Sequence, residues 1–318
     1  MVMVGGATRL TESGLSITEW KPISGALPPM NPADWERVFE QYRDTTQYQM
    51  LNRGMTLSQF QGIFWWEWSH RLLGRAIGFL FAAPLIAFWI GGRLEGRLLP
   101  VLVLFALGGL QGFVGWLMVQ SGLSGRTEVN PAWLAAHLAV AFVIMALALW
   151  LALDAFGWPR KASTLGAPRW SAAALMALVF AQVMFGALLA GARGGPAFPD
   201  WPTIGHEWIP SSAFGLEPFL RNFTDNHAAQ HLMHRTTGYF VALSALAIAG
   251  LAFMGGTGAA RAAGIAVGVL ALCQAALGVV TILLLDPLAL ALAHQAGAAM
   301  LWGTAAVLAR AANGSITP

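Results

Sequence analysis

Residues 98–125 read LLPVLVLFALGGLQGFVGWLMVQSGLSG, an apolar run of 28 residues without a charged side chain. A helix needs about 20 such residues to cross the ~30 Å hydrocarbon core of a bilayer. This stretch therefore predicts a membrane-spanning helix, and comparable runs along the chain predict an all-α polytopic membrane protein.

The composition agrees with a membrane protein whose main contact is lipid. Of 318 residues, 57% are hydrophobic and only 10% are charged, against about 25% charged residues in a soluble domain. Lysine and arginine (18) barely outnumber aspartate and glutamate (15) and are scattered, so nothing points to nucleic acid as a partner. The single cysteine, Cys273, excludes an intramolecular disulfide and a CxxC metal or redox site.

Six runs are long enough to cross a bilayer, and a seventh, shorter run follows a cluster of tryptophans typical of a membrane interface. The seven predicted spans are residues 76–92, 98–125, 129–153, 170–192, 236–260, 262–285 and 287–309. Residues 1–6 resemble the last turns of another apolar helix. We therefore expect most of a first span to be missing, through a late start codon or because the chain is a fragment.

The charges in the short loops predict the orientation, because lysine and arginine near span ends favour the cytoplasm. The basic residues on one side of the spans are Arg93, Arg97, Arg160, Lys161, Arg169, Arg261 and Arg310. The opposite side receives the larger polar segments, residues 10–69, 121–132 and 193–230. We place these segments in the periplasm and the spans in a bacterial inner membrane.

The two halves of the chain share sequence patterns at similar spacing. The matching pairs are His70 and His234 in His-Arg-x-x-Gly, Gln111 and Gln274 in Gln-x-x-x-Gly, and His137 and His294, at offsets of 164, 163 and 157 residues. These matches predict an internal duplication into two tandem four-helix bundles. The predicted halves are residues 1–154 and 170–318, joined by a cytoplasmic linker at 155–169.

The four repeated histidines lie in the outer part of alternate spans, at one predicted depth. A single intramembrane histidine more often bonds a neighbouring helix than binds a ligand, but four at repeat-related positions favour ligation. Imidazole binds several metals. Two histidines per bundle, with glycines leaving room for a flat macrocycle, favour a porphyrin held between facing helices. Each half is thus predicted to hold one haem.

Residues next to the first histidine of each half distinguish the two halves. Arg71 and Arg235 suit haem propionates, and they equally suit the anchoring of a helix end at the interface. Glu67 stands one turn before His70, where the other half has His231. A carboxylate there can move protons or stabilise positive charge on a substrate, so we assign the chemistry to the N-terminal half. The alternative interpretation of Glu67 is a helix cap.

Longer motifs resemble the haem A synthase family of mitochondria and alphaproteobacteria. They are GGATRLTESGLS at residues 5–16, EWKP at 19–22, PP at 28–29, GMTL at 54–57, FWWEWSHRLLGR at 64–75, GWLMVQSGL at 115–123, AHL at 136–138, HR at 234–235 and AHQAGA at 293–298. The resemblance covers essentially the whole chain. One branch of the family carries cysteine pairs in its outer loops, and this sequence has none there.

The resemblance implies an oxidoreductase acting on CH or CH2 groups, which oxidises the C8 methyl of haem O to the formyl group of haem A by two hydroxylations, for cytochrome oxidase. It implies eight spans, a resident haem b on His234 and His294, and substrate haem O at His70 and His137. Glu67 matches the family's essential outer-loop glutamate. The implied partners are an electron acceptor or donor and haem O synthase or oxidase-assembly factors; a homo-oligomer is left open.

Two other classes of protein compete with this interpretation. A dihaem b-type membrane electron-transfer protein would explain the four histidines without a need for Glu67 or the long segment 10–69. A transporter would suit the duplication. Four histidines at one outer depth, and spans without mid-membrane charges, argue against a transporter.

Overall fold

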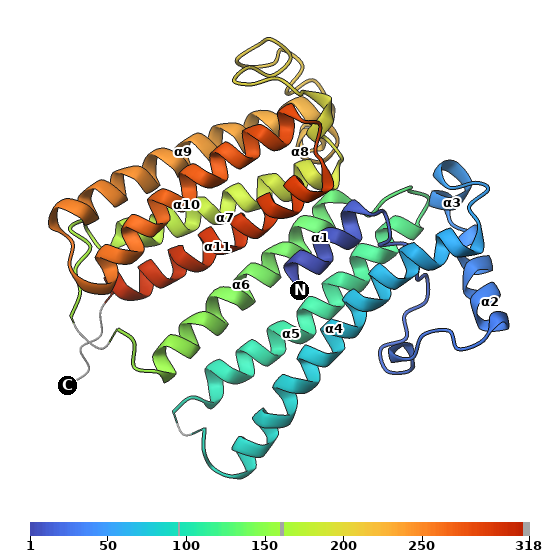
Figure 1. Cartoon of the computed structure of the whole chain (residues 1–318), viewed down its shortest axis with the longest axis horizontal. Helices are drawn as coiled ribbons and strands as arrows, with labels where there is room; N and C mark the ends of the chain where they lie inside the picture. The colour runs from blue at the N-terminus through green and yellow to red at the C-terminus, as the bar shows by residue number, and fades with distance from the viewer. Residues whose placement is uncertain (95, 160–161, 314–318) are drawn as a thin grey trace. The chain divides into compact units, whose positions relative to one another are not determined.

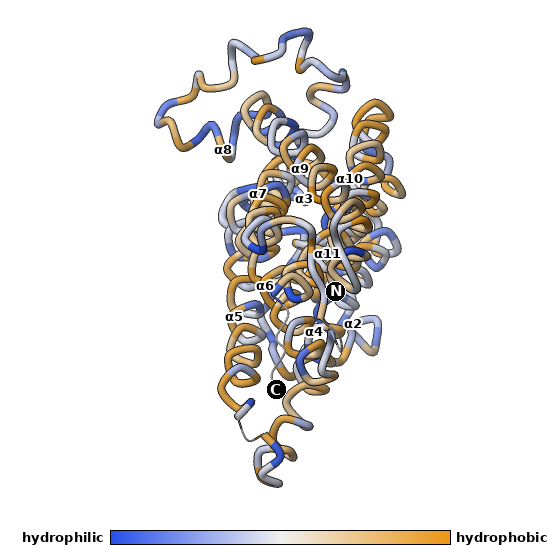
Figure 2. Tube along the Cα trace, turned by 90° about the vertical axis from the view of Figure 1, so that its left-hand side faces the viewer, coloured by the Kyte–Doolittle hydropathy of each residue, from blue (hydrophilic) through white to orange (hydrophobic). Residues whose placement is uncertain are grey.

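The computed structural model describes residues 1–94, 96–159 and 162–313, so Arg160 and Lys161 lie outside the described residues. Within these ranges the chain is helical, with isolated bridges in place of strands, which confirms the predicted all-α class. Six helices are long and apolar enough to cross a membrane, and Figure 2 shows them largely in hydrophobic colours. They are α4 (Leu57–Ile90), α5 (Leu98–Leu123), α6 (Pro131–Ala155), α7 (Trp170–Gly191), α9 (His227–Gly255) and α10 (Gly258–Leu283).

The last predicted span along the chain, residues 287–309, is present as a helix, α11 (Leu288–Ala312). It is not among the six described helices that are long and apolar enough to cross a membrane. The polar His294 and Gln295 and many small residues lower its hydropathy. Six spans are therefore confirmed, and the crossing of α11 stays a prediction.

Two helices begin earlier than their apolar runs, because polar turns precede the membrane part. Thr56 and Gln59 form a capping box at the start of α4, with Thr56 N donating to the Gln59 side chain (2.8 Å) and Gln59 N to Thr56 Oγ1 (3.3 Å). Asn226 caps α9, where its side chain accepts from Ala228 N (3.0 Å). Each extension carries the first histidine of its half on a continuous helix.

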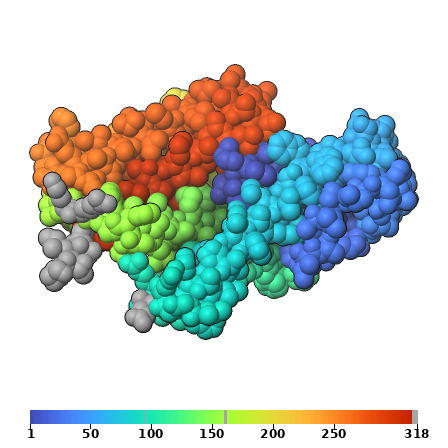
Figure 3. All heavy atoms as spheres, turned by 60° about the horizontal axis from the view of Figure 1, so that its bottom comes forward, coloured from blue at the N-terminus to red at the C-terminus, as the bar shows by residue number. Residues whose placement is uncertain are grey.

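In the N-terminal unit (Met1–Val140), α4 packs against α5 and against the short α1 (Val2–Leu10). The outer segment between α1 and α4 holds η1 (Ser24–Ala26), α2 (Pro32–Arg43) and α3 (Thr46–Leu51). An aromatic cluster of Phe39, Tyr42, Phe60 and Phe64 joins α2 to the outer end of α4. Figure 3 shows the blue outer segment lying against the light-blue surface of α4.

In the C-terminal unit (Ala141–Pro318), α7, α9, α10 and α11 form a closed four-helix bundle (Figure 1). Small residues allow close packing: a Cβ on Gly264 of α10 would stand 2.8 Å from the Ala252 side chain of α9. Trp302 Nε1 of α11 donates to the Phe142 carbonyl (2.8 Å), which ties the second part of α6 to this bundle. The predicted linker at 155–169 stays a prediction. On the outer side lie η2 (Gly195–Ala197) and α8 (Arg221–Asp225).

Candidate functional site

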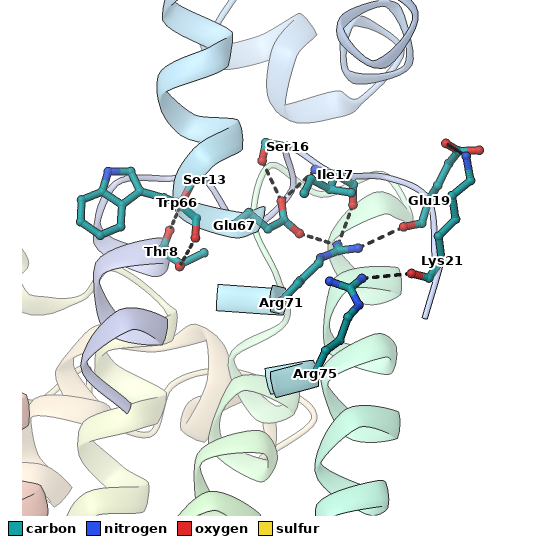
Figure 4. Close-up of polar contacts among 10 residues, drawn as sticks. All are labelled: Thr8, Ser13, Ser16, Ile17, Glu19, Lys21, Trp66, Glu67, Arg71 and Arg75. Atoms are coloured by element: carbon teal, nitrogen blue, oxygen red, sulfur yellow. Dashed lines mark hydrogen bonds and ion pairs between the residues drawn. The ribbon is translucent and has the colours of Figure 1, made fainter. Parts of the chain in front are cut away.

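Glu67 is buried, with 3% of its surface exposed, more fully than any other carboxylate that the structure describes in the N-terminal unit. Ser16 Oγ and Ile17 N both donate to its Oε2 atom, each at 2.8 Å. Its Oε1 atom forms an ion pair with Arg71, one turn further along α4. Figure 4 shows this arrangement, in which loop and helix enclose the carboxylate from opposite sides. Three donors therefore hold one buried negative charge within a turn of His70.

Arg71 and Arg75 fasten the outer loop to α4. Arg71 donates to the Glu19 carbonyl (3.0 Å) and the Ile17 carbonyl (2.7 Å). Arg75 donates to the Pro22 carbonyl (2.8 Å) and the Lys21 carbonyl (3.0 Å). In Figure 4 the loop runs past the two arginines in this order. The predicted role of Arg71 toward a propionate stays a prediction, and the structure assigns its guanidinium to loop carbonyls and Glu67.

The C-terminal unit repeats this device with one change. Arg235 donates to the carbonyls of Phe198 and Asp200, both at 2.8 Å, and so fastens the second outer loop. His231 takes the place of Glu67: its Nε2 contacts the Gly194 carbonyl (2.8 Å) and its Nδ1 contacts Arg235 (3.1 Å). A carboxylate in one unit thus stands where an imidazole ring stands in the other, and the different roles expected of the two halves stay a prediction.

The second outer loop is also organised by the Asp200 carboxylate. It accepts hydrogen bonds from Thr203 Oγ1 (3.0 Å), Gly205 N (3.0 Å) and His206 N (3.1 Å). Burial alone raises the pKa of Asp200, but these donors outweigh it and lower the pKa to about 2. The Asp200 carboxylate, in the loop bound by Arg235, therefore stays negatively charged at neutral pH.

Each of the four predicted ligand histidines lies against a glycine of a neighbouring helix. A Cβ on that glycine would stand 2.8–3.0 Å from the histidine Cε1 atom, closer than side chains pack. The pairs are His70 with Gly5, His137 with Gly115, His234 with Gly186, and His294 with Gly278. The glycines leave room for the imidazole rings, and the room they are expected to leave for a macrocycle stays a prediction.

A glutamine one turn before the glycine contacts three of these rings. Gln111 Nε2 lies 3.1 Å from His137 Nε2, Gln182 Nε2 lies 3.5 Å from His234 Nε2, and Gln274 Nε2 lies 3.1 Å from His294 Nδ1. The repeated Gln-x-x-x-Gly motif thus supplies both a seat and a polar contact for a histidine. This explains the motif, whose role the sequence alone left open.

His234 and His294 come together in the C-terminal bundle, with ring centroids 6.4 Å apart and planes at 81°. One metal ion bound by both rings would separate the centroids by about 6 Å, allowing about 2 Å for each metal–nitrogen bond. The buried Nδ1 atom of His234 has no hydrogen-bond partner among the described residues. The pair therefore has the spacing that two histidines would need in order to hold one haem iron between them.

His70 and His137 are the corresponding pair of the repeat in the N-terminal unit. Their Nδ1 atoms are buried without a hydrogen-bond partner in the described part of the chain. Glu67 lies one turn from His70 on the same helix. The structure thus keeps Glu67 and His70 side by side, and it adds contacts of Ser16 with Glu67 and of Arg75 with the outer loop.

The sequence matches proteins of one family along most of its length. The profile of the COX15-CtaA family, described as cytochrome oxidase assembly protein, matches residues 1–306. The haem A synthase of Parvibaculum lavamentivorans is 46% identical over 96% of this chain and 88% of its own length. Those of Methylobacterium radiotolerans and Rhodopseudomonas palustris are 48% and 50% identical, over 99% and 94% of this chain and 86% and 83% of their own lengths. The chain therefore belongs to the cytochrome oxidase assembly family that includes these haem A synthases.

Proposed function

We propose that this protein is a haem A synthase, an oxidoreductase that converts the C8 methyl of haem O to a formyl group by two hydroxylations. The observation that carries the proposal is the unequal duplication. Both units hold a histidine pair seated on glycines, and among the described residues only the N-terminal pair has a buried carboxylate, Glu67, beside it. One unit is thus built for a resident cofactor, and the other for a reaction.

In the C-terminal unit, His234 and His294 would hold haem b, which supplies one-electron transfer when bound. Gly186 and Gly278 fix the two rings from behind. His231, hydrogen-bonded to Arg235 and to the Gly194 carbonyl, joins the second outer loop to the start of α9.

In the N-terminal unit, His70 and His137 would bind or line the site for haem O. Glu67 would then face the reacting part of the substrate, with its charge oriented by Ser16, Ile17 and Arg71. A fixed negative charge stabilises positive charge that develops at the methyl carbon during oxidation. Because both carboxylate oxygens already accept hydrogen bonds, an electrostatic role suits Glu67 better than proton transfer.

The proposed setting follows from the orientation of the spans. Basic residues at one end of the helices place that end in the cytoplasm, so both histidine pairs and both outer loops lie on the periplasmic side of a bacterial inner membrane. Electrons released by the oxidation need an acceptor. Contact with haem O synthase or with oxidase-assembly factors would serve the transfer of a poorly soluble substrate and product.

The proposed activity is tested by expressing the chain in a host that makes haem O and lacks haem A. Extracted haems are separated by chromatography and identified by mass. Haem A, or its hydroxymethyl precursor, is the expected product. Bound haem b with haem O left unconverted would contradict the proposal and favour the dihaem electron-transfer protein.

The glycine seats give a separate prediction. Valine at Gly186 would push the His234 ring out of line, since even a Cβ would stand 2.8 Å from the ring, so we expect the haem b content of the purified protein to fall several-fold. The pyridine haemochrome spectrum measures this content. Gly250→Val is the matched control in the same bundle, because a Cβ at Gly250 meets nothing within 4 Å. Equal haem content in the two variants would show that the seat does not position the ligand.

A further inference from the structure

The loop before α2 exposes large apolar side chains in an otherwise charged outer segment. Residues 22–33 carry no charge, between Lys21 and Asp34. Within them, Ile23 is 86% exposed and Leu27 and Met30 are each 75% exposed. Each of these three side chains, all within one short loop, exposes apolar surface that is unfavourable in water.

Arg75 determines the position along α4 at which this loop is held. Its guanidinium donates to the carbonyls of Pro22 and Lys21, and a Cβ on Gly25 would stand 2.9 Å from its Nη2 atom. The 3-10 turn η1 packs on α4 at the same place. The loop therefore lies beside Arg75, several turns after the start of α4 at Leu57, as Figure 4 shows for Lys21.

Arg75 marks the outer limit of the apolar part of α4. No described residue of α4 after it is charged, and the next basic residue is Arg93. From Arg75, α4 continues to Ile90, about 22 Å at a rise of about 1.5 Å per residue, and Arg93 lies in the turn that follows. This length covers most of the ~30 Å hydrocarbon core. With Arg93 at the inner boundary, Arg75 and the loop carbonyls bound to it stand at the outer boundary.

We propose that residues 22–30 form an interfacial anchor, in which Ile23, Leu27 and Met30 insert into the outer leaflet and Arg75 holds the loop at that depth. A basic residue, Lys21, and a half-exposed tryptophan, Trp20, precede the apolar residues, the arrangement typical of a segment at a membrane interface. The neighbouring residues 16–19 carry the contacts to Glu67 and Arg71. Lipid thus helps to hold the loop that encloses Glu67.

The anchor is tested with single cysteines at Ile23 or Leu27, introduced into a Cys273→Ser background. The purified protein is labelled with an environment-sensitive fluorophore and reconstituted into vesicles of phosphatidylcholine and phosphatidylglycerol. Nitroxides at a shallow acyl-chain position should quench both labels several-fold more than aqueous iodide does. Met50→Cys is the matched control: Met50 is 71% exposed on α3, and its label should respond to iodide alone.

Two results would overturn the anchor. Labels at Ile23 and Leu27 that respond to iodide as the Met50 label does would place the loop in water. Labels shielded from both quenchers would place it against protein. Arg75→Ala tests the second part of the proposal, because it should reduce nitroxide quenching at Leu27; unchanged quenching would show that Arg75 does not set the depth.

Discussion

Replacing Glu67 by glutamine is expected to lower the conversion of haem O to haem A by about two orders of magnitude or more, with an unchanged content of haem b. Glutamine keeps the shape of the side chain and removes its charge. The charge is buried, with 3% of the residue exposed, and is held by Ser16, Ile17 and Arg71. The measurement is the ratio of haem A to haem O in extracts, beside the haem b spectrum of the purified protein.

Glu19→Gln is the matched control for the loss of a negative charge. Glu19 pairs with Lys21 on the surface, with 38% of its side chain exposed, and its pKa is lowered mainly by that lysine. An exposed ion pair contributes little to stability, so this variant should retain conversion. Conversion retained in Glu67→Gln would refute the assignment of the chemistry to Glu67.

A structural role for Glu67 makes a different prediction from a catalytic one. If Glu67 mainly holds the loop, its loss should move the loop, and a fluorophore at Leu27 would report a changed depth. If its charge acts on the substrate, conversion falls while the label stays in place. Ser16→Ala supports this comparison, because it removes one donor (2.8 Å) and keeps the carboxylate. We expect that variant to retain most of the conversion.

The sequence predicted those helices that coincide with one uninterrupted apolar run, such as α5 and α10, because the length of the run gives the length of the helix. It placed the starts of α4 and α9 too late, because polar turns capped by Thr56 and Asn226 extend both helices beyond the apolar run. It treated residues 10–69 as a loop, although Asn31 caps α2 by accepting from Asp34 N (2.9 Å). Hydropathy indicates which residues contact lipid, whereas a capping residue determines where the helical backbone begins. A search for apolar runs therefore misses the polar turns that precede them.

The candidate site was predictable where partners stand one helical turn apart. Glu67 and His70 share a face of one helix, and the spacing alone indicates that. The donors to Glu67 were not predictable, because Ser16 and Ile17 lie about 50 residues away and a backbone N–H carries no signature in the sequence. Arg75 continues the spacing of Glu67 and Arg71 by one further turn of the same helix, but the loop carbonyls that it binds were not predictable.

His294→Ala is expected to reduce the haem b content of the purified protein by more than about tenfold. Mutations of residues that only support a metal's direct ligands often lower metal affinity by about tenfold or more, and loss of a direct ligand should cost at least as much. His234 and His294 lie with ring centroids 6.4 Å apart, so each would supply one side of the same iron. Alanine leaves His234 without its counterpart, and the glycine seat at Gly278 then has no ring to hold.

Two control variants show whether haem b is lost because a haem ligand is removed or because any histidine is removed. His206 is exposed in the second outer loop, so His206→Ala should bind haem b normally. His137→Ala should also retain haem b, because His137 belongs to the N-terminal pair, and it should lose conversion of haem O. Haem b retained in His294→Ala and lost in His137→Ala would exchange the roles of the two units. That result would also place Glu67 beside the resident haem, and the unequal duplication would then no longer identify the N-terminal unit as the site of reaction.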